Sequence, residues 1–366
     1  MMQIQSKFHS YDVTEAPGLR EAMQSATAQG QRTFALVDSH VYALYPEAFE
    51  QSLPPENVRL IEATEGAKSL DALGPSIEWL LRSGFRRDCL LLVVGGGVLQ
   101  DLSCFIASTL FRGVRWSLVP TTLLAQCDSC IGSKSSINVG HFKNQMGTFY
   151  PPHQVLLAFD VLRSLPPDEV RSGLGEAIKL HLIEGEAAVA RLRPKLSGYE
   201  TEPALLNEIV WDSLAIKQRF IEEDEFDQNV RNLLNYGHTF GHAYESATDY
   251  AIPHGIAVTL GVLTATFFSS RLGWVSPDYF ESLQGWLVPY YAPYQETLTA
   301  ADPERILAAM RLDKKNTGDT LGCILTRGAG QMEKTKLSFD GQVRPLLAEC
   351  LPALVSRTAR LEKTPL

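Results

Sequence analysis

The chain has 366 residues, of which 45% are hydrophobic and 20% charged, as is usual for a globular protein of two or three domains. Its formal net charge of −9 argues against a nucleic-acid partner and against an anionic membrane surface. No apolar run reaches the ~18 residues that a membrane helix needs, and the first residues lack the apolar core of a signal peptide. We therefore expect a cytoplasmic protein that does not enter a membrane.

The first part of the chain alternates short apolar runs with helical patterns, which is typical of βαβ units. The apolar runs predict strands at residues 33–38, 58–63, 89–94 and 114–119. The first of these strands ends in an acid, Asp38. Residues 1–165 are thus predicted to form an α/β, Rossmann-like domain.

The pattern changes after two prolines, Pro166 and Pro167, which together with Asp168 make a favourable helix start. From there long helical patterns dominate. They cover residues 172–184, 203–223, 229–248 and 256–272. Residues 166–366 are therefore predicted to form an all-helical domain.

Three consecutive glycines, Gly95, Gly96 and Gly97, follow the strand at 89–94 and precede a helical pattern. Glycines allow the backbone to approach a pyrophosphate, and a helix N-terminus favours its negative charge. The run is not the GxGxxG dinucleotide fingerprint, however, and a simple tight turn explains it equally well. Glu65 and Lys68 could meet ribose hydroxyls and a phosphate, or could belong to a solvated loop.

The most informative stretch contains three of the eight histidines of the chain. His238 and His242 are four residues apart and are expected on one face of a helix; His254 follows, and Glu176 is on the first helix of the second half. Three nitrogen or oxygen ligands with an open position form a catalytic divalent-metal site, typically a zinc site. A lone histidine is more often a packing or surface residue, but a cluster flanked by glycines is harder to explain by packing alone.

Six segments occur in an order and spacing typical of one enzyme family. They are GGGVLQDL (95–102), the stretch 111–138, KNQMGTFYPP (143–152), SGLGEAIK (172–179), RNLLNYGHTFGHA (231–243) and PHG (253–255). From about residue 30 to residue 330, the chain resembles dehydroquinate synthases and the wider sugar-phosphate cyclases. The resemblance implies a Zn²⁺ or Co²⁺ ion held by Glu176, His238 and His254, with His242 beside it as a proton-relay residue.

The same resemblance implies that residues 1–165 are a dinucleotide-binding domain that holds NAD, and that the substrate is phosphorylated. The residues that match NAD contacts are Asp38, Glu65, Lys68, Gly95, Gly96, Gly97, Asp101, Thr121 and Thr122. The residues that match substrate and catalytic positions, besides His242, are Arg112, Asp128, Lys134, Lys143, Asn144, Lys179, Lys217, Arg231, Asn235 and either Lys314 or Lys315. Because the arginine at the position of Arg112 reaches the neighbouring subunit's phosphate site in this family, we expect a homodimer.

The implied reaction begins when NAD oxidises a substrate hydroxyl, which acidifies the adjacent C–H so that phosphate can leave. The hydride then returns, and the ring opens and recloses. Cyclases that act on sedoheptulose 7-phosphate or glucose 6-phosphate tend to lose the residues that match Arg231 and Asn235. This chain keeps both, so we expect a sugar acid, a 3-deoxy-heptulosonate 7-phosphate of the shikimate pathway. We also expect these two residues to share a face of the helix that carries His238 and His242.

The chain also departs from the pattern of the family. Gly132-Ser133-Lys134-Ser135 stands where GGK and threonine are usual, Gln100 replaces a glycine, and Ala158-Phe159 replaces an Asp-Thr pair. A specialised cyclase that makes amino-dehydroquinate, 2-epi-5-epi-valiolone or 2-deoxy-scyllo-inosose is therefore an alternative. A metal-dependent alcohol dehydrogenase would lack a use for the phosphate-binding lysines, and an inactive binding protein would not need the full set of metal and proton-relay residues.

Overall fold

The computed structural model describes residues 1–28, 30–140, 142–312, 316 and 318–356. The chain divides into two compact units. The first unit comprises Met1–Pro166 and Lys217–Asp227, and the second comprises Pro167–Ile216 and Gln228–Leu366. The short return of the chain, Lys217–Asp227, thus belongs to the first unit, whereas a boundary at residue 165 assigns it to the second domain.

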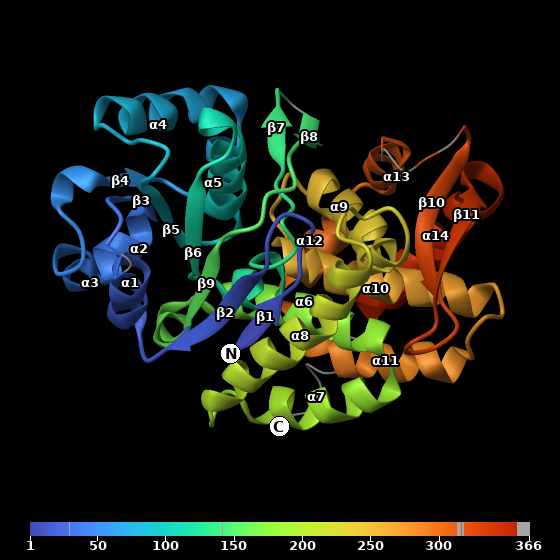
Figure 1. The fold of residues 1–366 in the computed structure, drawn as a ribbon. Coiled ribbons are helices and arrows are strands. Elements are labelled where there is room, and N and C mark those ends of the chain that lie inside the picture. The colour runs from blue at the N-terminus through green and yellow to red at the C-terminus, as the bar shows by residue number, and fades with distance from the viewer. Residues whose placement is uncertain (29, 141, 313–315, 317, 357–366) are drawn as a thin grey trace. The chain divides into compact units, whose positions relative to one another are not determined.

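The first unit is built on a seven-stranded sheet with the order β1-β2-β9-β6-β5-β3-β4 (Figure 1). The strands are β1 (Met2–Ile4), β2 (Tyr11–Ala16), β3 (Thr33–Asp38), β4 (Val58–Ile61), β5 (Leu90–Gly95), β6 (Arg115–Pro120) and β9 (Gln154–Ala158). Only the pair β1–β2 is antiparallel among these strands. Strands β3, β5 and β6 are buried, which explains their continuous apolar runs.

Helices accompany this sheet, as the alternating pattern predicts. They are α1 (Leu19–Thr27), α2 (Ser39–Leu44), α3 (Pro46–Glu50), α4 (Leu70–Arg82) and α5 (Gly97–Thr109). A small antiparallel pair, β7 (Ile137–Val139) and β8 (Phe142–Met146), follows the π-helical turn η4 (Ala125–Ser129). Strand β3 pairs with β4 on one side and with β5 on the other. The direction in which successive strands are added to the sheet therefore reverses between β3 and β5. The carboxyl ends of strands at such a point are where α/β sheets bind ligands.

The second unit is mainly helical. It contains α6 (Pro167–Glu184), α7 (Glu186–Gly198), most of α8 (Ala204–Glu223), α9 (His238–Ala247), α10 (His254–Arg271), α11 (Pro277–Tyr291), α12 (Gln295–Ala300), α13 (Pro303–Arg311) and α14 (Arg344–Ser356). Helix α10 is buried almost along its whole length, as expected of a helix that is apolar all round. No helix in the described ranges is long and apolar enough to span a membrane.

Two of our predictions for this half need correction. The unit is not all-helical, because β10 (Thr320–Thr326) and β11 (Met332–Ser338) form an antiparallel hairpin. Its turn contains Gly328 and Gly330, both at positive φ, which β-hairpin turns favour.

The single helix predicted at residues 229–248 is also wrong. The segment forms a 3₁₀ helix, η6 (Val230–Asn235), and then α9, separated by Gly237 with φ +81°. Besides this left-handed conformation, a Cβ atom at Gly237 would lie 2.8 Å from the carbonyl oxygen of Val258, so glycine is required. Arg231 and Asn235 are therefore not on the helix of His238, and in a 3₁₀ helix residues four apart do not share a face.

Candidate active site

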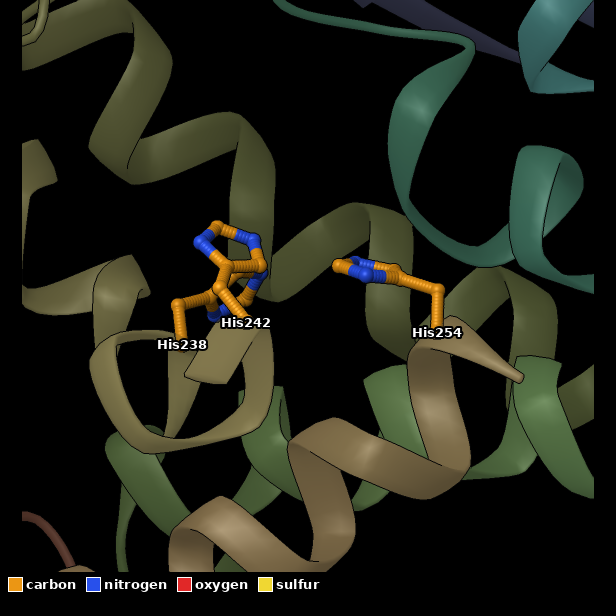
Figure 2. A group of neighbouring side chains, drawn as sticks. All are labelled: His238, His242 and His254. Carbon is orange, nitrogen blue, oxygen red and sulfur yellow. The ribbon is translucent and has the colours of Figure 1, made fainter. Parts of the chain in front are cut away.

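Three histidines gather in the second unit, from the starts of two helices (Figure 2). His238 and His242 lie one turn apart on α9, and His254 is the first residue of α10. One potential ligand atom from each lies within 4.8 Å of the others. The ring centroids are 5.3 to 5.6 Å apart. This is the spacing of side chains that can bind one metal ion.

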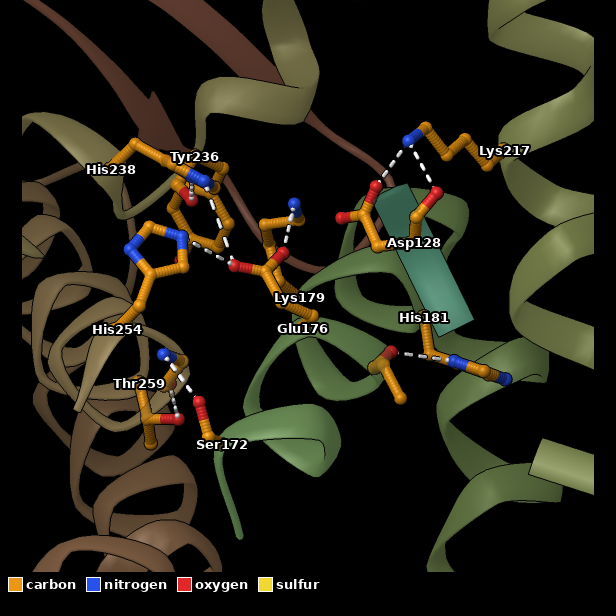
Figure 3. A network of polar contacts seen from close by, with 12 residues as sticks. Asp128, Ser172, Glu176, Lys179, His181, Lys217, Tyr236, His238, His254 and Thr259 are labelled. Carbon is orange, nitrogen blue, oxygen red and sulfur yellow. Dashed lines mark hydrogen bonds and ion pairs between the residues drawn. The ribbon is translucent and has the colours of Figure 1, made fainter. Parts of the chain in front are cut away.

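Glu176 of α6 reaches the same cluster (Figure 3). Its Oε1 lies 3.6 Å from Nε2 of His238 and 3.3 Å from Nε2 of His254. Its other carboxylate oxygen forms a buried ion pair with Lys179, one turn further along α6. Two imidazoles and a carboxylate thus converge, which is the nitrogen–oxygen donor set that divalent zinc prefers.

Glu245 of α9 orients one of these histidines. Its Oε2 lies 3.1 Å from Nδ1 of His254, which leaves Nε2 of that ring directed toward Glu176. Metal-ligating histidines commonly donate their second ring N–H to a carboxylate in this way. Burial lowers the pKa of His254, but the carboxylates of Glu245 and Glu176 outweigh it and raise the pKa to about 10. The same two carboxylates would favour a bound cation.

Glycines bring α6 and α10 close enough for this convergence. A Cβ atom on Gly175 would lie 2.1 Å from the carbonyl oxygen of Gly255, and one on Gly255 would lie 1.8 Å from the carbonyl oxygen of Ser172. The Gly255 N–H also donates to Ser172 Oγ at 3.0 Å. The backbones therefore touch directly beside Glu176 and His254, which explains the glycines that flank both residues.

Replacing Gly175 with alanine should separate the two helices. We expect the Gly175→Ala variant to lose at least about 1–3 kcal/mol of unfolding free energy, because the added methyl group overpacks the contact. The exposed Gly74→Ala on α4 is the control, since its Cβ meets nothing within 4 Å apart from its chain neighbours. The gain from replacing a helical glycine is offset there by crowding against the following Pro75, so the net change should be small. Denaturant unfolding of both variants measures the difference; equal stabilities would contradict the contact.

The glycine run lies at the carboxyl end of β5, at the change of direction in the sheet. Gly95 ends β5, Gly96 caps α5 and Gly97 begins it. A Cβ atom on Gly96 would lie 2.8 Å from Cγ2 of Thr122. On the neighbouring strand, Asp38 ends β3 and its Oδ1 accepts the His40 N–H at 2.9 Å. These residues, with Thr121 after β6, leave a backbone surface and a helix N-terminus suited to a pyrophosphate.

Glu65, Lys68 and Asp101 are connected to one another through protein contacts. Lys68 forms a 2.9 Å ion pair with Asp101, whose carboxylate also accepts the N–H and Oγ–H of Ser136. Burial raises the pKa of Asp101, while Lys68 opposes the shift. Glu65 Oε1 accepts Nδ2 of Asn138 at 2.8 Å, and Asn138 Oδ1 accepts the N–H of Asn144 at 2.9 Å.

The predicted substrate residues of the first unit form two ion pairs. Nζ of Lys217 donates to the carbonyl oxygen of Asp128 at 2.6 Å and also pairs with its carboxylate. Nζ of Lys134 lies 2.6 Å from Oδ2 of Asp227. Segment Lys217–Asp227 therefore supplies one partner of each ion pair: Lys217 for Asp128, and Asp227 for Lys134. Arg112 is exposed and has φ +65°.

Of the other predicted substrate residues, some lie outside the described residues and two lie in η6. The side chain of Lys143 and the whole of Lys314 and Lys315 lie outside the described residues. In the second unit, Arg231 of η6 is buried, with 5% of its surface exposed. Nδ2 of Asn235 donates to the carbonyl oxygen of Asn232 at 3.0 Å.

Sequence reasoning missed several residues of these clusters. Glu245 could have been found, because it is seven residues after His238 and so on the same face of α9. Asn138 and Asp227 give no local signal, since their partners are distant in the sequence. Gln100, by contrast, is an unusual residue with a visible structural role: its amide exchanges hydrogen bonds with Ser129, which ties α5 to η4.

A parallel α/β unit with a glycine turn at its change of direction, followed by a helical unit with a histidine–carboxylate cluster, is the plan expected of a sugar-phosphate cyclase. Residues 58–172 match the family model for the 3-dehydroquinate synthase N-terminal domain, and residues 173–316 match that for its C-terminal domain. The 3-dehydroquinate synthase of Paracoccus denitrificans is 36% identical over 352 residues, covering 93% of this chain and 96% of the relative. The chain therefore belongs to the 3-dehydroquinate synthase family, as the resemblance predicts.

Solved structures confirm the fold class. A 2-deoxy-scyllo-inosose synthase complexed with carbaglucose-6-phosphate, NAD⁺ and Co²⁺ superposes with a TM-score of 0.81 at 23% identity, covering 95% of this chain and 99% of that one. A 2-epi-5-epi-valiolone synthase from Streptomyces hygroscopicus subsp. jinggangensis with NAD⁺ and Zn²⁺ gives 0.79 at 23% identity, covering 96% and 99%. At these identities the likeness concerns the fold.

Proposed function

We propose that this chain is a 3-dehydroquinate synthase, which converts a 3-deoxy-heptulosonate 7-phosphate to a carbocycle with elimination of phosphate. The observation that carries the proposal is the convergence of Glu176, His238 and His254 in a chain 36% identical to a 3-dehydroquinate synthase over 93% of its length. The solved cyclases of the same fold were crystallised with NAD⁺ and with Co²⁺ or Zn²⁺.

Both groups fit the residues that are present. A divalent metal would be held by Glu176, His238 and His254, and NAD by the residues at the carboxyl ends of β3, β5 and β6. When bound, NAD would accept and return a hydride, while the metal would polarise the oxygen that is oxidised. The buried Lys179 neutralises Glu176, so the ligand set would carry little net negative charge of its own.

The remaining residues bind the substrate and move protons. Lys134 supplies a cationic group, and a phosphate is recognised by such groups through charge-assisted hydrogen bonds. Lys217 would meet the ring and the carboxylate end of the substrate. His242, exposed beside the other two histidines, would exchange a proton with the substrate. Arg231 would pair with the substrate carboxylate, since a guanidinium matches a carboxylate with two parallel hydrogen bonds. Binding of phosphate by Lys143, Arg112 and either Lys314 or Lys315 is likewise a prediction, as are the homodimer and the cytoplasmic location.

One assay tests the proposal and its use of NAD. The protein is incubated with the heptulosonate 7-phosphate, Zn²⁺ or Co²⁺, and NAD below the substrate concentration; released phosphate and product mass are measured together. We expect many phosphates per NAD and no accumulation of NADH at 340 nm, because the hydride returns to the substrate. Stoichiometric NADH without phosphate would instead identify an alcohol dehydrogenase, and a preference for sedoheptulose 7-phosphate or glucose 6-phosphate would identify a specialised cyclase.

A further inference from the structure

The turn before Lys134 has an uncommon backbone conformation. Gly132 has φ +106° and Ser133 has φ +58°. A left-handed conformation costs a glycine little, but it disfavours a serine, whose Cβ crowds the backbone. Ser133 is also one of the residues that depart from the usual GGK pattern. Non-glycine residues held in this region persist only where their surroundings fix them, and they concentrate at functional sites.

A buried carboxylate fixes Ser133. Ser133 Oγ donates to Oε1 of Glu225 at 2.8 Å, and both residues are buried, with 6% and 3% of their surfaces exposed. The backbone of the turn is also held on both sides. The Gly132 N–H donates to the hydroxyl of Tyr11 at 3.1 Å, and the Ser133 carbonyl accepts the N–H of Tyr150 at 2.6 Å.

The connection between β1 and β2 contributes to the same carboxylate. Ser6 Oγ donates to Oε1 of Glu225 at 2.6 Å, and the Lys7 N–H donates to Oε2 at 2.6 Å. Hydrogen bonds to an ionised acceptor are stronger than neutral ones, and a buried carboxylate needs them. Glu225 thus joins the N-terminal hairpin to the turn that carries Lys134.

The short segment that contains Glu225 also contacts the ammonium group of Lys134. Asp227, two residues after Glu225, is itself left-handed at φ +57° and accepts Nζ of Lys134 at 2.6 Å. Residues 225–227 therefore contact both the backbone turn before Lys134, through Ser133, and the ammonium group of Lys134 itself. Lys134 remains half exposed, with 48% of its side chain accessible, so it can still meet a ligand.

We propose that Ser133 and Glu225 are positioning residues for Lys134. The β1–β2 connection contributes to this positioning, because Ser6 and Lys7 donate hydrogen bonds to Glu225. The inference rests on the proposed function in that Lys134 binds the phosphorylated substrate. It predicts that a residue with a side chain at position 133 supports full activity only while its hydroxyl is bound to Glu225, although neither group touches the substrate. It also accounts for the serine in place of glycine: the Ser133–Glu225 hydrogen bond compensates for the unfavourable left-handed backbone.

Two substitutions at one position separate the hydroxyl from the backbone. Ser133→Ala removes the hydrogen bond but keeps a side chain that disfavours φ +58°, whereas Ser133→Gly removes both. We expect Ser133→Ala to lower kcat/KM about 10–100-fold, the loss typical of a small displacement in an active site. Ser133→Gly should recover most of this loss. Parent-like activity of Ser133→Ala, or equal losses in the two variants, would overturn the proposal.

The N-terminal hairpin provides a matched pair of variants. Ser6→Ala removes a donor to Glu225 and should lower kcat/KM several-fold. Ser10→Ala lies in the same connection but its hydroxyl donates to Gln5, so it should behave like the parent enzyme. Equal effects of the two substitutions would mean that the hairpin acts only through overall stability, contrary to the proposal.

A readout without substrate separates failure of this inference from failure of the proposed function. Acetylation of lysines by an N-hydroxysuccinimide ester is followed by peptide mass spectrometry, with the exposed Lys336 as internal reference. Ser133→Ala should raise the labelling rate of Lys134 several-fold as its pairing with Asp227 loosens, and Ser133→Gly should not. This result with a parent protein that releases no phosphate would reject only the function; an unchanged rate in Ser133→Ala would reject the inference.

Discussion

Removal of the divalent metal is expected to abolish phosphate release, and added Zn²⁺ or Co²⁺ is expected to restore it. The expectation follows from Glu176, whose Oε1 lies within 3.6 Å of Nε2 of both His238 and His254. Three ligands are too few for the site to tolerate the loss of one. His238→Ala and His254→Ala should therefore both lose most of the bound metal and nearly all activity, as elemental analysis and the phosphate assay would show.

A milder substitution tests the orientation of His254. Glu245→Gln keeps the shape of the side chain but weakens the hydrogen bond to Nδ1, so we expect metal affinity to fall about 10–100-fold. Activity should return at saturating metal, because the ligands themselves are intact. Glu349→Gln, in an exposed ion pair with Arg271, is the matched control and should bind metal normally. For the parent enzyme, full activity in a metal-free sample would refute the metal site itself.

The sequence predicts strands β3, β4, β5 and β6 of the first unit because their signal is local, but it does not predict β1, β2 and β9. Buried parallel strands are apolar on both faces, so residues 33–38 and 89–94 are recognisable without knowledge of their neighbours. The histidine cluster is visible for a similar reason. His238 and His242 are one helical turn apart, and His254 is the next histidine along the chain.

What the sequence does not reveal depends on contacts between distant residues. The pattern at 229–248 is helical in composition, but Gly237 adopts a left-handed conformation with φ +81°. The distant carbonyl oxygen of Val258, 2.8 Å from where a Cβ would lie, further restricts this position to glycine. The return of Lys217–Asp227 to the first unit is equally hidden. It brings Lys217 to Asp128 and Asp227 to Lys134, pairs that neither periodicity nor spacing indicates.

The proposal that the substrate is a sugar acid rests most on Arg231, whose replacement should have a large and selective effect. The residue is 5% exposed and precedes the left-handed turn at Gly237, after which the helix of His238 begins. A guanidinium keeps its charge when buried and presents five N–H donors in a fixed fork. A substrate carboxylate would provide two oxygens in the matching geometry.

If Arg231 binds that carboxylate, Arg231→Ala should cost ~2–4 kcal/mol of transition-state stabilisation, because a buried charge on the substrate is left unpaired. Arg231→Lys should recover only part of this, since an ammonium cannot form the two parallel hydrogen bonds. The test is kcat/KM for the heptulosonate 7-phosphate and for sedoheptulose 7-phosphate, with the exposed Arg305→Ala as a control. The loss should be confined to the sugar acid. Equal losses for both substrates would show that Arg231 is structural, and a parent enzyme that prefers sedoheptulose 7-phosphate would move the assignment to the cyclitol-forming cyclases.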